Sequence, residues 1–265
     1  MGNSKGLVIL NIVTLAVMLF ANYAYNADIF SNATVGDVSH KYDTLFAPAG
    51  YAFSIWGLIF LLCIGFVGYQ CVLLKKGDPK QLIRRTGLWF TISNVANTLW
   101  LYCWINEMLA LSVILILLLL FCLCMLTVRL RLELDDEPVR TIFFVWWPVV
   151  IYLGWMMVAS IACIAAWLVD TGWRGGEFGE VAWTILMVAV ATILYLFLVR
   201  KRNMREAAIV GIWAFIAIAV RQWENHNNIS IAAIIASVIL LAATAIHAYK
   251  SRNYSPLAKL KRGEW

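Results

Sequence analysis

The feature that most constrains this 265-residue chain is a series of long apolar stretches, almost free of charge, that alternate with short polar segments. A helix needs about 20 apolar residues to cross a bilayer core of roughly 30 Å. Eight windows approach or exceed that length: residues 6–24, 48–73, 86–105, 108–128, 141–169, 181–199, 206–220 and 229–249. With 63% hydrophobic and 14% charged residues, the chain is too apolar for a soluble domain. We therefore predict an all-α integral membrane protein with about eight transmembrane helices.

The basic residues indicate an orientation. If the N-terminus is cytoplasmic, all 21 Lys and Arg residues except Lys41, Arg174 and Arg221 fall on the cytoplasmic side, as the positive-inside rule requires. We therefore expect both termini in the cytoplasm, in a multi-pass protein of a bacterial cytoplasmic membrane. The net charge of +6 then reflects this topology and contact with the lipid bilayer rather than nucleic-acid binding.

Two polar segments divide the chain. Residues 25–47 separate the first two windows and are too charged to cross the membrane and longer than a turn requires. They form either a disordered spacer or, through their scattered aromatic residues, a lid that folds back over a cavity. A second break, rich in Gly and acidic residues, covers 169–181. We expect a five-helix transmembrane bundle at 1–169, a three-helix transmembrane extension at 170–249 and a basic cytoplasmic tail at 250–265.

Charged residues are missing from the middle of every window. Ion pumps, proton-coupled transporters and voltage sensors usually need such a residue, so these classes are disfavoured. The three histidines have no Cys or carboxylate grouped at ligand spacing, and we predict no metal site. The remaining acids near the predicted outer rim are better explained by solvation than by catalysis, so no catalytic residue is assigned. These rim residues are Asp28, Asp37, Asp43 and Glu107.

Large rings recur at helical spacing in three of the windows. Three faces result: Phe53, Trp56 and Phe60; Asn97, Trp100 and Trp104; and Pro148, Tyr152, Trp155 and Ala159. The first interpretation is a helix–helix core packed with aromatic rings, with a buried Asn joining helices, and periodicity alone favours it. The second is an amphipathic pocket for a flat, mostly apolar ligand, in which the amide and the phenol fix the ligand's orientation.

Short motifs on these faces resemble those of a known family. The second window opens on Pro48, continues through Tyr51 and Phe53, and then carries Trp56 and Phe60; the third contains Asn97-x-x-Trp100 followed by Trp104, and the fifth Tyr152-x-x-Trp155. This order is similar to that of the TspO/MBR family, the tryptophan-rich sensory and translocator proteins. The resemblance covers residues 1–169 and implies a five-helix bundle with a pocket beneath the loop 25–47. It implies ligand-binding roles for Pro48, Tyr51, Phe53, Trp56, Phe60, Asn97, Trp100, Trp104, Tyr152 and Trp155.

The resemblance also implies a class of function, namely a membrane-embedded binding or sensory protein for a flat hydrophobic ligand of the tetrapyrrole, sterol or isoprenoid type. No cofactor is required; a porphyrin-like, heme-like or sterol-like molecule would be the ligand. Two alternatives remain open. The last three helices could complete a transporter of a small lipophilic solute, or the protein could be a membrane-embedded enzyme acting on such a ligand. The expected partners are the bilayer and a hydrophobic small molecule, with a homodimer as a further alternative.

Overall fold

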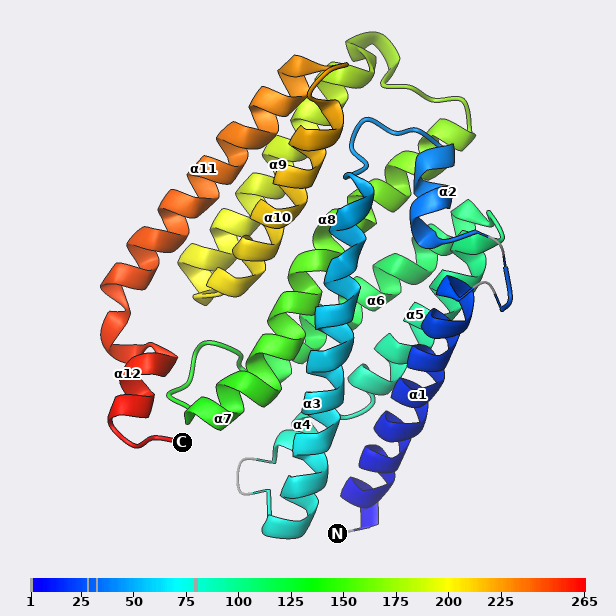
Figure 1. The fold of residues 1–265 in the computed structure, drawn as a ribbon. Coiled ribbons are helices and arrows are strands. Elements are labelled where there is room, and N and C mark those ends of the chain that lie inside the picture. Colours follow the sequence, from blue (N-terminus) through cyan, green and yellow to red (C-terminus); the bar gives the residue numbers. More distant parts are fainter. Residues whose placement is uncertain (1, 28, 32, 79–80) are drawn as a thin grey trace.

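The computed structural model describes residues 2–27, 29–31, 33–78 and 81–265, and the regular secondary structure in these ranges is entirely helical (Figure 1). The long helices are α1 (Gly2–Asn26), α3 (Ile55–Lys76), α5 (Trp89–Ile105), α6 (Leu109–Arg129), α8 (Trp147–Asp170), α9 (Gly179–Arg202), α10 (Arg205–Gln222) and α11 (Asn227–Lys250). The short ones are α2 (Val35–Lys41), α4 (Leu82–Thr86), α7 (Val139–Thr141) and α12 (Pro256–Lys261). A 3-10 turn (Gly50–Ser54) precedes α3, and a π-helical turn (Ile142–Trp146) joins α7 to α8.

Each of the eight apolar windows coincides with one long helix. Within the described ranges, six helical segments are long and apolar enough to cross a membrane, which confirms an integral multi-pass protein. The other two differ for physical reasons. Helix α5 has 17 residues, equivalent to about 25 Å at 1.5 Å per residue. Helix α10 has 18 residues and carries charge at both ends, on Arg205, Glu206 and Arg221.

The long helices pack in two groups that meet at α8 and α10. One group contains α1, α3, α5, α6 and α8, and the other contains α9, α10 and α11. A β-carbon on Gly154 of α8 would lie 2.9 Å from the Cα of Ala207 in α10. Such small residues let two helix backbones approach closely within a membrane, where hydrophobic burial does not drive helix association. The Tyr195 hydroxyl of α9 also donates to the Gly154 carbonyl, at 2.7 Å.

Buried amides join the first helix to its neighbours. Asn11 donates to Gln70 of α3 at 2.9 Å and accepts from the Thr91 hydroxyl of α5 at 2.7 Å. One turn further along α1, Thr14 accepts from the Asn94 amide at 3.1 Å. Each amide has a polar partner on another helix, so uncharged polar groups, rather than ion pairs, hold α1 against the bundle at these positions.

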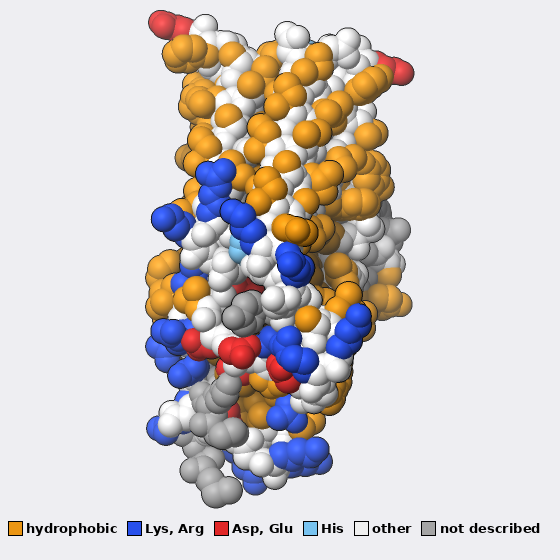
Figure 2. Space-filling view, turned by 90° about the vertical axis from the view of Figure 1, so that its left-hand side faces the viewer, with side chains coloured by type: hydrophobic (Ala, Val, Ile, Leu, Met, Phe, Trp, Pro, Cys, Tyr) orange, Lys and Arg blue, Asp and Glu red, His pale blue; other side chains and the backbone are white. Residues whose placement is uncertain are grey.

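The two ends of the molecule differ in charge and in structure. Both termini, α4, α7 and α12 lie toward one end, whereas α2 and the connection from α8 to α9 lie toward the other (Figure 1). On the face seen in Figure 2, hydrophobic side chains cover the upper part, and Lys and Arg gather in the middle and lower parts. The basic side chains on this face therefore lie toward the end that holds the termini.

Candidate functional site

Aromatic residues from three helices and one turn converge near the end of the molecule that carries α2. The Trp56 ring stacks on Trp100, with centroids 6.1 Å apart, and meets Trp155 edge-on at 6.4 Å. Phe53 packs edge-on against Trp155 at 6.0 Å, and Trp104 stacks on Trp100 at 6.1 Å. These five rings form what we call the aromatic pocket.

Local sequence explains how α3 presents its rings. Pro48 and the 3-10 turn that follows bring the chain from the polar loop into α3. The backbone N–H of Ala49 donates to the Ala217 carbonyl of α10 at 3.1 Å, which fixes the start of this turn against the second helix group. Phe53 and Trp56, three residues apart, then lie on the same side of the chain and face α5 and α8.

A buried series of hydrogen bonds closes the aromatic pocket on the side away from α2. The Asn97 amide donates to the Tyr152 hydroxyl at 2.9 Å and accepts from the Asn22 amide of α1 at 3.0 Å. Trp56 lies edge-on against the Tyr152 ring, with centroids 5.8 Å apart. Asn97 and Tyr152 therefore bind each other and position Trp56, rather than presenting free polar groups to the space between the rings.

The space between the rings is small. The cavity has a volume of about 30 Å³, which is room for about two water molecules. Its lining consists of Val35, Ser39, Pro48, Phe53, Trp56, Trp100, Trp104, Trp155, Val158, Ala159, Ala162 and Cys163. The indole N–H groups of Trp100 and Trp155 are buried there without an oxygen or nitrogen acceptor among the described residues, and Trp100 lies against the Cys163 thiol, a weak acceptor. Buried indole N–H groups usually have a partner, so these two donors are suited to an acceptor that enters the cavity.

Residues 25–47, described except for positions 28 and 32, cover this cavity, and we call them the lid. The Trp104 indole donates to the Val35 carbonyl at the start of α2, at 3.1 Å. At the other end of α2, Lys41 binds Glu107 at 2.5 Å, and the Tyr42 hydroxyl donates to the same carboxylate at 2.8 Å. The lid is thus held by the Trp104 indole in the last turn of α5 and by the Glu107 carboxylate in the turn between α5 and α6.

The end of the lid is fastened to α10. Arg221 pairs with Asp43 at 2.9 Å, and the Gln222 amide donates to the Leu45 carbonyl at 3.0 Å. The lid therefore contacts both helix groups, and its release requires breaking contacts with α5 and with α10.

The rim carboxylates form hydrogen bonds and ion pairs that hold the lid in place. Hydrogen bonds from Lys41 and Tyr42 lower the pKa of Glu107 below its usual value. A hydrogen bond from the Thr34 hydroxyl likewise lowers the pKa of Asp37, which caps the N-terminus of α2. With Asp43 paired to Arg221, all three described rim acids take part in structural contacts, and Asp28 lies outside the described residues.

Comparison with known families identifies the chain. The model of a family described as TSPO-like protein matches residues 8–246. The chain belongs to the TspO-like family. The match runs through α9, α10 and most of α11, so it extends beyond residue 169, where the sequence motifs end. No curated protein and no solved structure matches the chain.

The structure brings most of the predicted site residues of this TspO-like protein together, but not all of them. Phe60 stacks on the outer side of Trp56 at 5.4 Å and does not line the cavity. Tyr51 is 44% exposed and packs edge-on against Trp213 of α10 at 5.3 Å. Asn22, which sequence reasoning did not single out, binds Asn97; the signal available for it was a lone amide inside an apolar window.

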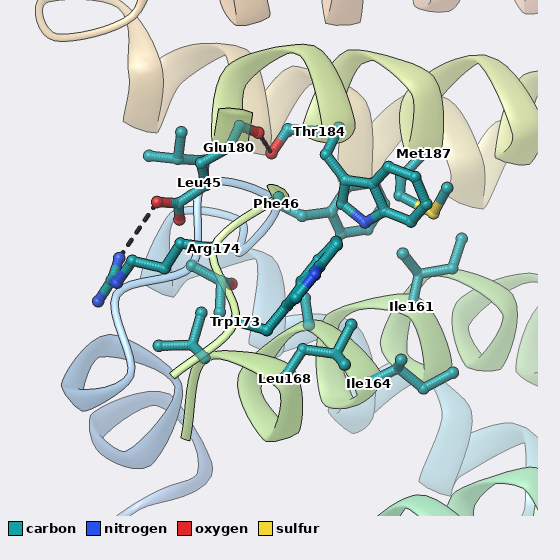
Figure 3. Close-up of a pocket in the computed structure, with 15 residues that line it drawn as sticks. Leu45, Phe46, Ile161, Ile164, Leu168, Trp173, Arg174, Glu180, Thr184 and Met187 are labelled. Atoms are coloured by element: carbon teal, nitrogen blue, oxygen red, sulfur yellow. Dashed lines mark hydrogen bonds and ion pairs between the residues drawn. The ribbon is translucent and has the colours of Figure 1, made fainter. Parts of the chain in front are cut away.

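A second cavity, of about 120 Å³, lies between the outer ends of α8 and α9 (Figure 3). The lid residues 44–46 cover it, and Trp173 and Trp183 meet edge-on at its wall, with centroids 5.1 Å apart. Arg174 pairs with Glu180 at 3.1 Å beside it (Figure 3). Because the lid covers cavities on two sides of α8, its displacement would open both.

Proposed function

We propose that this TspO-like protein is a membrane-embedded binding and sensory protein for a flat hydrophobic ligand, of the tetrapyrrole, sterol or isoprenoid type, held in the aromatic pocket beneath the lid. The observation that carries the proposal is the pair of buried indole N–H groups of Trp100 and Trp155, neither of which has an oxygen or nitrogen acceptor within the described part of the chain. A ligand with a carboxylate, carbonyl or hydroxyl oxygen would satisfy these donors, while the rings would supply apolar contact area.

Ligand binding requires a conformational change. A cavity of about 30 Å³ is far smaller than any such ligand, so the lid and at least some of the rings must move apart. Trp56 and Phe53 are only partly buried and lie beside the lid, which makes them the rings best placed to move. The ligand would replace the ring–ring contacts with ring–ligand contacts of similar chemistry, so the closed state is a resting state of the proposed site.

A binding role is favoured over transport of a solute through the helix bundle. The Asn22–Asn97–Tyr152 chain crosses the floor of the pocket with short hydrogen bonds, and a solute moving onward would have to break them within the apolar interior. The described rim acids are held in lid contacts, so none is free to act as a general acid or base in the closed state.

We further propose that all eight long helices cross the membrane, with both termini in the cytoplasm of a bacterial cell. The placement of basic residues supports this orientation. In this arrangement residues 1–169 hold the ligand, residues 170–249 support α8 and the lid through α10, and residues 250–265 form a cytoplasmic tail.

The test is a titration of purified protein, in nanodiscs, with protoporphyrin IX and with heme, followed by tryptophan fluorescence. We expect saturable quenching and weaker binding, by about fivefold to tenfold, for Trp155→Phe, because that change removes one indole donor and keeps an apolar ring. Trp167→Phe is the matched control, since Trp167 also belongs to α8 but does not line the pocket.

Sterol and isoprenoid ligands are tested by competition with bound porphyrin and by their own effect on the melting temperature. If none of the three ligand classes binds saturably, the proposed function is refuted. The ligand site lies elsewhere if two results occur together. The ligand would bind equally well to wild type and Trp155→Phe, and its association rate would not change in a variant that loses a lid contact, such as Glu107→Gln.

A further inference from the structure

A polar cavity of about 270 Å³ lies at the opposite end of the bundle from the lid. The connection from α6 to α7 forms one wall, the first turn of α10 and the last turn of α11 form the others, and α12 covers it. We call it the polar cavity. It shares no lining residue with the aromatic pocket, so any ligand that it holds is independent of the proposed function above.

The cover of the polar cavity is anchored by a buried lysine. The Lys259 side chain, on α12, is only 4% exposed and binds the carboxylate of Asp136. Its ammonium group also donates to the Glu137 carbonyl at 2.6 Å. The Glu264 carbonyl accepts from the backbone N–H of Val139 at 3.0 Å. These contacts use two of the three donors of the Lys259 ammonium group, and its charge also acts to lower the pKa of Glu133.

Two glutamates in the cavity lining have unpartnered oxygen atoms. Within the described ranges, Glu133 Oε1 and Glu206 Oε2 are buried and accept no hydrogen bond. Arg205 is the nearest cation on the same helix as Glu206, but its Nε is likewise buried without a partner in the described part of the chain. Burying carboxylate oxygens without donors is costly. One oxygen of each glutamate therefore has no hydrogen bond within the described ranges, although Arg205 and Lys259 line the same cavity.

Glu206 also lines a second, apolar space. A crevice of about 550 Å³ lies between α3, α8 and α10, and Trp147, Ile151, Ile209 and Trp213 contribute to its walls. Glu206 is its one acidic lining residue and belongs to the polar cavity as well. The Trp147 indole N–H is buried in this wall and lies within reach of the Glu206 carboxylate. We call this space the lipid crevice; it places an apolar channel directly beside the unpartnered carboxylates.

We propose that the polar cavity and the lipid crevice together form a binding site for an amphiphile with a primary ammonium head group, whose apolar tail lies in the crevice and whose ammonium group donates to Glu206 and Glu133. An ammonium group has three donors and a positive charge, so it can donate to the unpaired oxygen of each glutamate and add to the positive charge of Arg205 and Lys259. The apolar walls of the crevice suit an alkyl chain. Such a ligand can come from an aminated phospholipid of the surrounding bilayer or from a free lipophilic amine.

The charged surroundings give this site a pH dependence. Asp135, which pairs with Arg131, and Asp136, which pairs with Lys259, face the cavity from the α6–α7 connection; Arg205 and His247 face it from α10 and α11. Burial and the neighbouring Glu206 carboxylate raise the pKa of Glu133 to about 8. An ammonium group prefers the ionised carboxylate, so its binding releases a proton, and affinity falls by up to about tenfold per pH unit below 8.

The experiment measures the melting temperature of the full chain in phosphatidylcholine nanodiscs while dodecylamine or dodecanol is added. We expect dodecylamine, but not the neutral dodecanol, to raise the melting temperature saturably, with an affinity that is higher at pH 8 than at pH 6. Glu206→Gln should weaken dodecylamine binding at least tenfold, because it removes the charge at nearly constant shape. Glu224→Gln is the matched control, because Glu224 is exposed and lies two residues beyond the other end of α10.

Two further arms complete the test. Replacing part of the phosphatidylcholine by phosphatidylethanolamine should stabilise wild type but not Glu206→Gln if the bilayer supplies the ligand; stabilisation by dodecylamine alone identifies a free amine. Ile209→Trp fills the lipid crevice without changing the acids, and should also weaken binding, which keeps the test informative if Glu206→Gln folds poorly. Three outcomes would overturn the proposal. The amine and the alcohol would change the melting temperature equally, wild type and Glu206→Gln would respond equally, or neither amine source would change the melting temperature.

Discussion

A single methyl group added at the contact between α8 and α10 should lower stability measurably. A β-carbon added at Gly154 would lie 2.9 Å from both the Cα and the carbonyl oxygen of Ala207, and 3.2 Å from the Cβ of Val210. Ordinary contacts begin at 3.4 Å, so the two helices would have to separate by about 0.5 Å. Because the atoms of Ala207 belong to the backbone, no rotamer change can relieve the clash.

The size of the effect follows from two opposing contributions. Overpacking of this kind costs about 1–3 kcal/mol, whereas Ala is favoured over Gly inside a helix by about 1 kcal/mol. We therefore expect Gly154→Ala to lower the free energy of unfolding by up to about 2 kcal/mol, the upper end applying because the clash is with backbone atoms. The hydrogen bond from Tyr195 to the Gly154 carbonyl would lengthen at the same time.

The assay is reversible unfolding in mixed micelles, followed by tryptophan fluorescence. Gly57→Ala and Gly68→Ala, both in α3, are the matched controls, because a β-carbon at either position meets no atom within 4 Å. These controls should be unchanged or slightly more stable. If Gly154→Ala is as stable as Gly57→Ala, then α8 and α10 do not pack as closely as described, and the three-helix group is not rigidly joined to the five-helix group.

Three further predictions concern single polar groups. Tyr152→Phe leaves the Asn97 amide without its acceptor and should destabilise the fold by about 1–2 kcal/mol in the same assay; an unchanged stability would mean that this hydrogen bond is not formed. Because the pKa of Glu107 lies below its usual value of 4.5, its bond to Lys41 is retained above that pH and lost as the pH falls through the lowered pKa. Porphyrin should therefore associate faster in stopped-flow measurements once the pH has fallen through this lowered pKa, and Glu107→Gln should show the fast rate at every pH. For Glu133 the sign is opposite: its raised pKa favours the protonated form in the folded state, so the free energy of unfolding should fall as the pH rises from about 4.5 to 8, and Glu133→Gln should remove this slope in a pH series of unfolding curves.

Much of the fold could be predicted because the membrane imposes strong local rules. A segment that crosses the bilayer must be apolar for about 20 residues and must satisfy its own backbone hydrogen bonds, so each of the eight windows could only be a helix. Helical spacing likewise placed Asn97, Trp100 and Trp104 on one face before any contact was known. The family could be inferred from the same residues, because its motifs are local patterns within single helices.

The contacts between helices depend on distances that no local pattern contains. Periodicity could not decide whether Asn97 and Tyr152 were free or bound to each other, because the answer depends on the rotation of three helices about their own axes. The convergence of Glu133 and Glu206 was hidden for the same reason: they lie 73 positions apart and meet only because α10 packs beside the α6–α7 connection. The sequence by itself determined that this chain is a helical membrane protein with aromatic faces. Only the tertiary structure decided which polar groups found partners, because hydrogen bonding requires atoms within about 3 Å, and that proximity is set by the packing of whole helices.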